Sequence, residues 1–236
     1  MADNSRKVYT TPDGVEYSRT GAFLPNPDLS RYNAGLGAKA LARRLSEFPR
    51  EPLEDAVEWA VEHYEDNTAR DIGSEAHQLI DDAIKGRTPS IVATDEALNA
   101  FEAWERWSRD NVAEYVANEL SLISTIRGYG GTIDAIGRMK DGRLMLLDWK
   151  TGSGFYDSYP LQVAAYVILA REHGYMVDGA MVIRLPKEVN GEAEVKDYTD
   201  RLNQYEVAWL GCVQTYYNLK PRRLKNNPIV KEIWGK

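Results

Sequence analysis

The sequence predicts an α/β fold in which a central mixed β-sheet is flanked by helices and preceded by a helical cap. Up to about position 117 the apolar residues recur every three to four positions, as in amphipathic helices. After that position the sequence contains runs typical of strands, with further helical segments among and after them. We therefore expect residues 1–116 to form an N-terminal segment with the cap and residues 117–236 to form the core, within one compact domain.

Three helices are predicted before residue 117. The first covers residues 51–67 and has Pro52 in its first turn, where proline is tolerated. The second covers residues 69–86 and closes on Gly86, because glycine readily ends a helix. The third begins after Thr94, a good N-cap residue, and runs through Trp107.

Strands are predicted from Leu120 onward. Residues 121–150 contain up to three strands, and the last two are joined by a tight turn at "KDGR", residues 140–143, because Asp-Gly favours hairpin turns. A helix over 159–174 follows, then a strand over 179–186, a further strand over 193–198 and a final helix over 202–219.

Length and composition exclude several classes of protein. The chain has 236 residues, of which 43% are hydrophobic and 28% charged, as in a globular domain with a sizeable core. It contains no apolar run long enough to cross a bilayer, and its start lacks the apolar core of a secretion signal, so we expect a cytoplasmic protein without a membrane partner. Cys212 is the single cysteine, so any metal site must use oxygen and nitrogen ligands.

The charge is unevenly distributed. A formal net charge of −7 argues against non-specific binding to a polyanion. However, residues 219–236 carry Arg222, Arg223 and four lysines against one glutamate, and residues 38–45 form a shorter basic strip. These strips could contact nucleic acid, but a solvated tail and an ordinary helix face explain them equally well.

Two aspartates on neighbouring predicted strands indicate a metal site. Asp134 lies in "GGTIDAIG", and Asp148 follows fourteen positions later in "LLDWKTG". Two strands joined by a tight turn could hold both carboxylates over one end of the sheet, where they repel each other unless a cation lies between them. Mg²⁺ fits this pair, because it prefers oxygen ligands and completes its shell with water and phosphate oxygens.

Lys150 lies two residues after Asp148 and therefore points to the same side of the strand. Its side chain could help to orient and deprotonate an attacking water, or its positive charge could stabilise charge that develops on phosphate oxygens. Trp149 points the other way, so we expect its side chain to pack and its backbone carbonyl to be available to a metal. This arrangement suits metal-assisted phosphodiester hydrolysis, and the alternative is a solvated strand end.

These motifs resemble the PD-(D/E)XK nuclease superfamily, in particular its RecB-like branch. "GTID", "LLDWKTG" and "PLQVAAY" match that branch's Gly-x-x-Asp strand, Asp-x-Lys strand and Gln-x-x-x-Tyr helix, and "ARDIGSEAHQLID" matches its upstream Gly-x-x-x-His helix. The N-terminus is also similar to the start of phage and mitochondrial genome-maintenance exonucleases, although the usual Ser-Val-Thr and a later Trp are absent. The resemblance covers residues 68–170 well and the first 45 loosely, and it implies a restriction-endonuclease-like core.

The resemblance implies a role for each matching residue. Asp134 and Asp148 would bind the metal, Lys150 would be the catalytic lysine, and His77 would approach the metal or the phosphate, although a lone histidine is more often structural. Further residues given a role by the resemblance are Glu119, an additional acid near the metal, and Gln162 and Tyr166, which would contact the nucleic-acid backbone or brace Lys150. Gln162 and Tyr166 could instead be buried helix residues. The aromatic residues that could stack on bases, but that we expect in the core, are Trp104, Trp107, Tyr216 and Tyr217.

The implied function is a Mg²⁺-dependent DNA exonuclease, with Mn²⁺ as a substitute, that acts in repair, recombination or replication in a bacterial or phage-infected cell. Its partner would be DNA that is single-stranded or has a free end, together with a recombination or single-strand-binding protein. An iron–sulfur cluster is excluded by the single cysteine. The alternatives are a structure-specific endonuclease of the same superfamily and a catalytically silent nucleic-acid-binding module. Polarity, DNA or RNA preference, the number of metals and the oligomeric state stay open.

Overall fold

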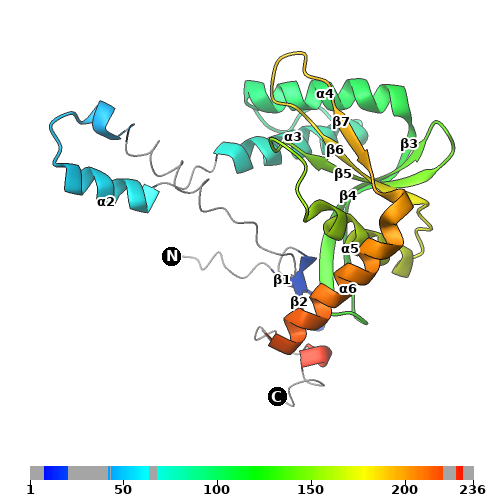
Figure 1. Cartoon of the computed structure of the whole chain (residues 1–236). Coiled ribbons are helices and arrows are strands. Elements are labelled where there is room, and N and C mark those ends of the chain that lie inside the picture. The colour runs from blue at the N-terminus through cyan, green and yellow to red at the C-terminus, as the bar shows by residue number, and fades with distance from the viewer. Residues whose placement is uncertain (1–7, 21–41, 43, 64–67, 220–226, 231–236) are drawn as a thin grey trace. The chain divides into compact units, whose positions relative to one another are not determined.

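The computed structural model describes residues 8–20, 42, 44–63, 68–219 and 227–230. The chain divides into two compact units: residues 26–72 form one, and residues 1–25 with 73–236 form the other. Helix α2 (Leu53–His63) belongs to the smaller unit, and α3 (Thr68–Ile84) begins there and continues into the larger one (Figure 1). The division into residues 1–116 and 117–236 stays a prediction.

The larger unit is built on a seven-stranded mixed sheet. The strands are β1 (Val8–Thr10), β2 (Glu16–Arg19), β3 (Val112–Ser124), β4 (Tyr129–Met139), β5 (Leu144–Lys150), β6 (Gly179–Arg184) and β7 (Glu194–Asp197). Their order is β1-β2-β4-β5-β6-β7, with β3 paired to β4 as well. The β2–β4 and β5–β6 pairs are parallel and the others are antiparallel.

Strand β4 has one partner strand along one edge and two partner strands, separated by a gap, along the other edge. Strand β3 pairs with β4 over its whole length, from Tyr129 to Met139. On the other edge β2 pairs at residues 129–130 and β5 pairs at residues 135–138. Among the described strands, residues 131–134 therefore have no partner on that edge, and Asp134 lies where the pairing with β5 ends.

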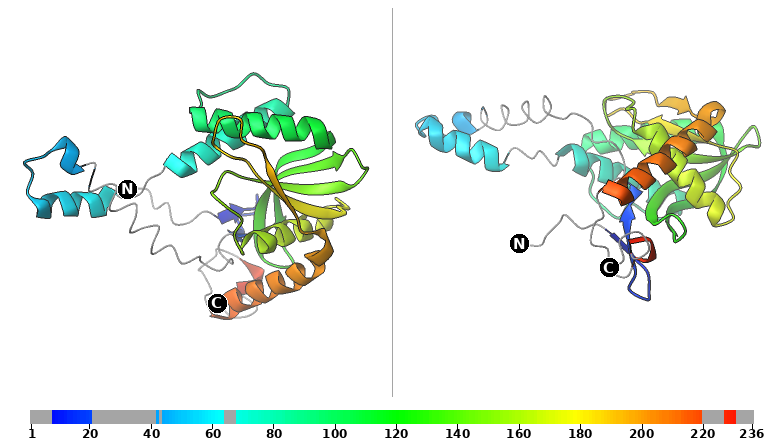
Figure 2. Two further views of the ribbon diagram at one scale, coloured as in Figure 1. Left: turned by 45° about the horizontal axis from the view of Figure 1, so that its top comes forward. Right: turned by 60° about the horizontal axis from the view of Figure 1, so that its bottom comes forward.

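Helices cover both faces of the sheet (Figure 2). Helices α5 (Tyr159–Glu172) and α6 (Leu202–Leu219), the latter preceded by the short η2 (Thr199–Arg201), share one hydrophobic core with Ile133 and Leu146. Helix α4 (Asp95–Asn111) packs on Trp149, whose indole meets Trp104 and Trp107 edge to face with centroids 6.4 and 5.8 Å away. The core is thus formed on both sides of β4, β5 and β6, which are almost wholly buried.

Most predicted elements are present. The mixed sheet flanked by helices is confirmed. Helix α2 begins directly after Pro52, α4 is capped by Thr94, whose hydroxyl accepts the N–H of Ala97, and the chain leaves α3 through Gly86 at φ 64°. The turn at residues 140–143 closes the β4–β5 hairpin, with Gly142 at φ 93°.

Two predictions about the strands were wrong. Strand β3 begins at Val112, directly after α4, and not at Leu120, because two register shifts within residues 112–117 disrupt the alternation that marks a strand. Residues 8–19 form a hairpin, although only helices were predicted before residue 117. Strands of three and four residues are too short for periodicity to reveal.

No helix in the described part of the chain is long and apolar enough to cross a membrane.

Candidate metal centre

The site forms around a distortion shared by β3 and β4. The pairs Asn118–Ala135 and Leu120–Ile133 place Glu119 opposite Asp134. Glu119 has φ 46°, in the left-handed region that residues other than glycine seldom adopt. Such backbone strain costs of order 1–3 kcal/mol and tends to occur at functional sites, where the surrounding structure imposes it. The strained residue is therefore a pointer to function.

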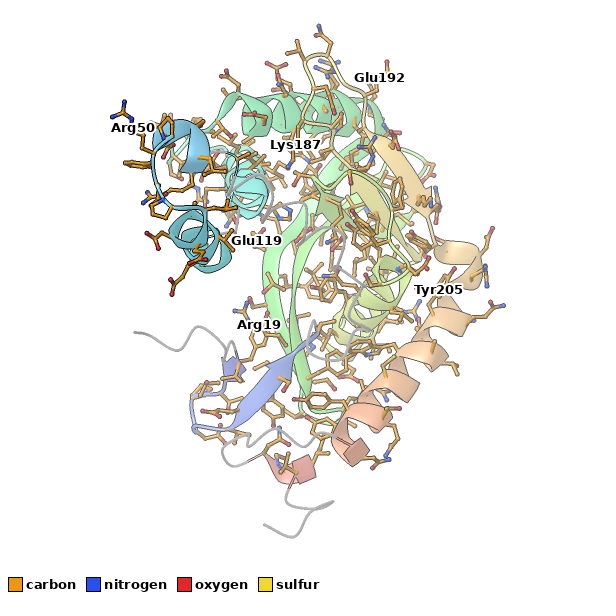
Figure 3. All side chains as sticks on the ribbon, turned by 60° about the vertical axis from the view of Figure 1, so that its left-hand side comes forward. Arg19, Arg50, Glu119, Lys187, Glu192 and Tyr205 are labelled. Carbon is orange, nitrogen blue, oxygen red and sulfur yellow. The ribbon has the colours of Figure 1, made fainter. Side chains whose placement is uncertain are left out.

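Three side chains from three elements converge there. His77 on α3, Glu119 on β3 and Asp134 on β4 each offer a ligand atom, and these atoms lie within 4.8 Å of one another. His77 Nδ1 is 3.6 Å from Asp134 Oδ1 and 3.8 Å from Glu119 Oε1. We call this set the acidic cluster; Figure 3 labels Glu119, its member on β3.

The backbone of β5 completes the cluster. His77 Nε2 lies 3.2 Å from the carbonyl oxygen of Trp149. The N–H of the same residue donates to Asp134 Oδ2 at 2.7 Å, so this carboxylate is fixed to β5 where the strand pairing ends. One oxygen of Asp134 thus bonds the backbone while the other points to His77, and the buried indole of Trp149 holds both backbone groups in place.

The surrounding carboxylates favour the protonated form of His77. Burial lowers the pKa of His77, but the Asp134 and Glu119 carboxylates outweigh it and raise the pKa to about 9. A metal ion would replace this proton, because only the neutral imidazole can be a ligand. Two carboxylates, an imidazole and a carbonyl are a donor set that fits a divalent cation.

Asp148 and Lys150 form a second group beside the cluster. Lys150 Nζ lies 2.6 Å from Asp148 Oδ2, and the two side chains are 19% and 1% exposed. Burial raises the pKa of Asp148, which the Lys150 charge opposes and the Asp134 charge reinforces. Burial lowers the pKa of Lys150, but the Asp148 and Asp134 carboxylates more than offset this, so the ammonium keeps its proton.

The structure therefore gives the two aspartates different partners. Asp134 lies with His77 and Glu119, whereas Asp148 pairs with Lys150 and is not among the described side chains that make up the cluster. Glu119 had the weakest sequence signal of all the candidates, yet it is one of the three side chains of the cluster. No local pattern could reveal it, because its position depends on pairing with β4 and on its own left-handed backbone.

Residues of helix α5 contact β4 and Lys150 next to the site. Gln162 Nε2 donates to the Tyr166 hydroxyl at 2.9 Å, and the buried Tyr166 ring lies against Gly131. A Cβ at Gly131 would come within 2.5 Å of that ring, so glycine is required there. Tyr159 begins the same helix, and its ring centroid is 5.3 Å from Lys150 Nζ, a cation–π distance.

The four aromatic candidates have packing roles. Trp104, Tyr216 and Tyr217 are buried, and Trp107 packs on Trp149, as a core role predicts. Arg222 and Arg223 lie outside the described residues.

Comparison with known proteins covers most of the chain. A model described as the PD-(D/E)XK nuclease superfamily matches residues 39–210, which include His77, Glu119, Asp134, Asp148 and Lys150. No curated protein matches the chain. A crystal structure from Eubacterium rectale described as "Putative exonuclease" is 14% identical, with a TM-score of 0.44, and the likeness covers 67% of this chain and 70% of that one.

Proposed function

The chain belongs to the PD-(D/E)XK nuclease superfamily, and on that premise we propose that it is a divalent-metal-dependent deoxyribonuclease of the RecB-like branch that degrades DNA from its ends. The observation that carries this proposal is the convergence of His77, Glu119 and Asp134 beside a buried Asp148–Lys150 pair. Nucleases of this superfamily generally use divalent metal ions, and these residues supply ligands for one.

The metal would be held by His77, Glu119, Asp134 and the Trp149 carbonyl, and Asp148, whose carboxyl group interacts electrostatically with Asp134 and His77, would lie beside them. Mg²⁺ suits the oxygen ligands, and Mn²⁺ suits the oxygen ligands and also accepts an imidazole. When bound, the metal would supply a Lewis acid and lower the pKa of a coordinated water. Asp134 would keep its orientation throughout, because the Trp149 N–H fixes one of its oxygens.

Lys150 would act as a charge and not as a base. The Asp148 and Asp134 carboxylates raise the pKa of Lys150 and so favour its ammonium form, which has no lone pair to accept a proton. A fixed positive charge in a buried setting stabilises the negative charge that develops on phosphate oxygens during hydrolysis. The buried Asp148–Lys150 pair also argues against a silent module, because two buried charges contribute little stability for their desolvation cost.

Three parts of this proposal rest on the resemblance. They are the preference for DNA ends, the role in repair, recombination or replication, and a protein partner that binds single-stranded DNA. An endonuclease of the same superfamily would have the same metal centre. A covalently closed circle distinguishes the two, since only an endonuclease can cut it.

End-labelled single-stranded and double-stranded DNA, beside a closed circle, would be incubated with Mg²⁺, Mn²⁺ or EDTA. We expect loss of the linear substrates alone, abolished by EDTA, and a fall of at least about a hundredfold in rate for Lys150→Ala. Lys140→Ala is the matched control: Lys140 lies at the opposite end of the β4–β5 hairpin, where it donates to the Arg109 carbonyl. A wild-type protein that cuts no DNA with either metal would refute the nuclease proposal.

A further inference from the structure

A row of hydroxyl groups and one arginine continues from the acidic cluster toward the N-terminal hairpin. Thr132 precedes Asp134 by two residues on β4, and its hydroxyl is 2.7 Å from the Tyr9 hydroxyl and 2.9 Å from the Ser121 hydroxyl. The Arg19 guanidinium lies over the Tyr9 ring, 5.3 Å from its centroid. These four side chains, which we call the hydroxyl–arginine row, come from β1, β2, β3 and β4.

The backbone fixes this row next to β4. Arg19 is paired with Gly130, and a Cβ at Gly130 would lie only 2.5 Å from the Tyr9 ring, so glycine allows the ring to lie directly on the strand. At about 3.3 Å per residue, Thr132 lies roughly 7 Å and Gly130 roughly 13 Å from Asp134 along β4. Figure 3 shows Arg19 and Glu119 on the same side of the sheet.

Arg19 has no acidic partner among the described residues. Within that part of the chain, no carboxylate oxygen lies within 4.0 Å of its guanidinium, whereas Arg127, Arg138 and Arg143 are all ion-paired. The residue is exposed, in a chain with a net charge of −7. An arginine that stacks on an aromatic ring keeps its N–H edge for an anion, and the planar guanidinium matches the geometry of phosphate.

We propose that Arg19, with the hydroxyls of Tyr9, Thr132 and Ser121, binds a backbone phosphate of the DNA strand whose scissile phosphate lies at the acidic cluster. This inference rests on the proposed nuclease function. A guanidinium and three hydroxyls offer only donors and acceptors that suit phosphate and sugar oxygens, so the contact would be independent of sequence. It would also offset the repulsion between the substrate and the acidic residues nearby.

The test compares wild type, Arg19→Ala and Arg19→Lys by fluorescence anisotropy of labelled DNA in EDTA over a salt titration, and by initial rates in Mg²⁺. For Arg19→Ala we expect about tenfold weaker binding and a salt slope reduced by about 0.7 to 0.9, the contribution of one phosphate contact. KM should rise by a similar factor while kcat changes by less than about twofold, because the contact is remote from the reacting atoms. Arg19→Lys should restore the salt slope but only part of the affinity.

Arg138→Ala is the matched control, because Arg138 lies on the same strand β4 but is bonded to Glu114 at 3.1 Å. Its salt slope should stay at the wild-type value. Thr132→Val removes the central hydroxyl at nearly constant shape and should weaken binding less than Arg19→Ala. An Arg19→Ala protein with wild-type KM and salt slope, in an enzyme that cleaves DNA, would overturn this inference alone. A wild type that neither binds nor cleaves DNA would overturn the nuclease proposal together with it.

Discussion

At the scale of single residues, the centre of the site depends on one strained backbone position. Glu119 is left-handed at φ 46°, and Asn190, in an exposed turn, is the other described non-glycine residue with a positive φ, at 57°. Asparagine tolerates this conformation through its short polar side chain, whereas glutamate has no such advantage. The surrounding structure imposes the strain at Glu119, and the result is a carboxylate directed toward His77 and Asp134.

Glu119→Gly should therefore separate stability from function. Glycine relieves the left-handed strain, so the free energy of unfolding should rise by about 1 kcal/mol, while loss of the carboxylate should weaken Mn²⁺ binding and reduce nuclease activity. Urea unfolding, calorimetric Mn²⁺ titration and the nuclease assay would measure these effects. Asn190→Gly is the control, and it should leave both metal binding and activity unchanged. Unaltered Mn²⁺ affinity in Glu119→Gly would show that this carboxylate is not a ligand.

At the scale of elements, helix α3 brings His77 to the sheet, and a hydrogen bond one turn later in the helix holds α3 against β3. Asp81, four residues after His77 and so on the same face of the helix, accepts a hydrogen bond from Asn118, the neighbour of Glu119. The same contact thus sets the position of both His77 and Glu119. Asp81 is also ion-paired with Lys85 and Arg87.

The end of α3 gives a prediction for the pH dependence of stability. Asp82 accepts hydrogen bonds from the Ser90 hydroxyl at 2.7 Å and the Ser90 N–H at 2.9 Å, and these bonds lower the pKa of Asp82. Because the pKa of Asp82 is lower in the folded protein, its ionisation stabilises the fold at pH values above 3.8, the pKa of the unfolded chain. This stabilisation is lost as the pH falls through the pKa of the folded protein. Ser90→Ala removes one of the bonds and so part of this effect.

We expect Ser90→Ala to lower the free energy of unfolding above about pH 4 and to approach wild type at lower pH, as followed by urea unfolding at a series of pH values. Ser153→Ala is the control, because Ser153 is exposed and contacts only the Tyr156 hydroxyl among described residues. A difference between Ser90→Ala and wild type that stayed constant from pH 2.5 to 7 would show that Asp82 ionisation is not its cause.

Prediction of the elements from sequence succeeded where the signal is local. Helices α2, α3 and α4 were predicted from apolar periodicity with Pro52, Gly86 and Thr94 at their ends. The N-terminal hairpin was missed because β2 gains its stability from β4, more than a hundred residues further along the chain. Strand β3 was predicted too short for a similar reason, since β4 stabilises its irregular first half.

At the scale of the whole molecule, the first and last segments that the structure describes contact each other. The Ser18 hydroxyl is 3.0 Å from the Tyr216 hydroxyl on α6, and the buried Asn227 side chain donates to the Glu16 carbonyl at 2.9 Å. Asn227 also accepts the backbone N–H of Ile229. The N-terminal hairpin therefore belongs to the same compact unit as α6, although the sequence suggested only a segment that precedes the cap.

Asn227→Ala should lower the free energy of unfolding by about 2 kcal/mol, because it removes the side-chain hydrogen bonds to the partly buried Glu16 carbonyl and Ile229 N–H. Hydrogen exchange should show that the Asn227→Ala substitution speeds amide exchange more in β1 and β2 than in β5 and β6. Asn203→Ala, at an exposed position on α6, is the control and should have little effect. Equal exchange rates in β1 and β2 for wild type and Asn227→Ala would show that this bond does not hold the hairpin.

The sequence by itself singled out Asp134, Asp148 and Lys150 on the two central strands as candidate site residues, and it predicted the helices and most strands, because apolar periodicity, caps and the Asp-Gly turn act over a few residues. Only the tertiary structure decided which residues share a site: Asp134 with His77 and Glu119, and Asp148 with Lys150. It also placed Arg19 along β4. The physical reason is that these groupings arise from strand pairing between distant segments and from one left-handed residue, and neither leaves a local pattern in the sequence.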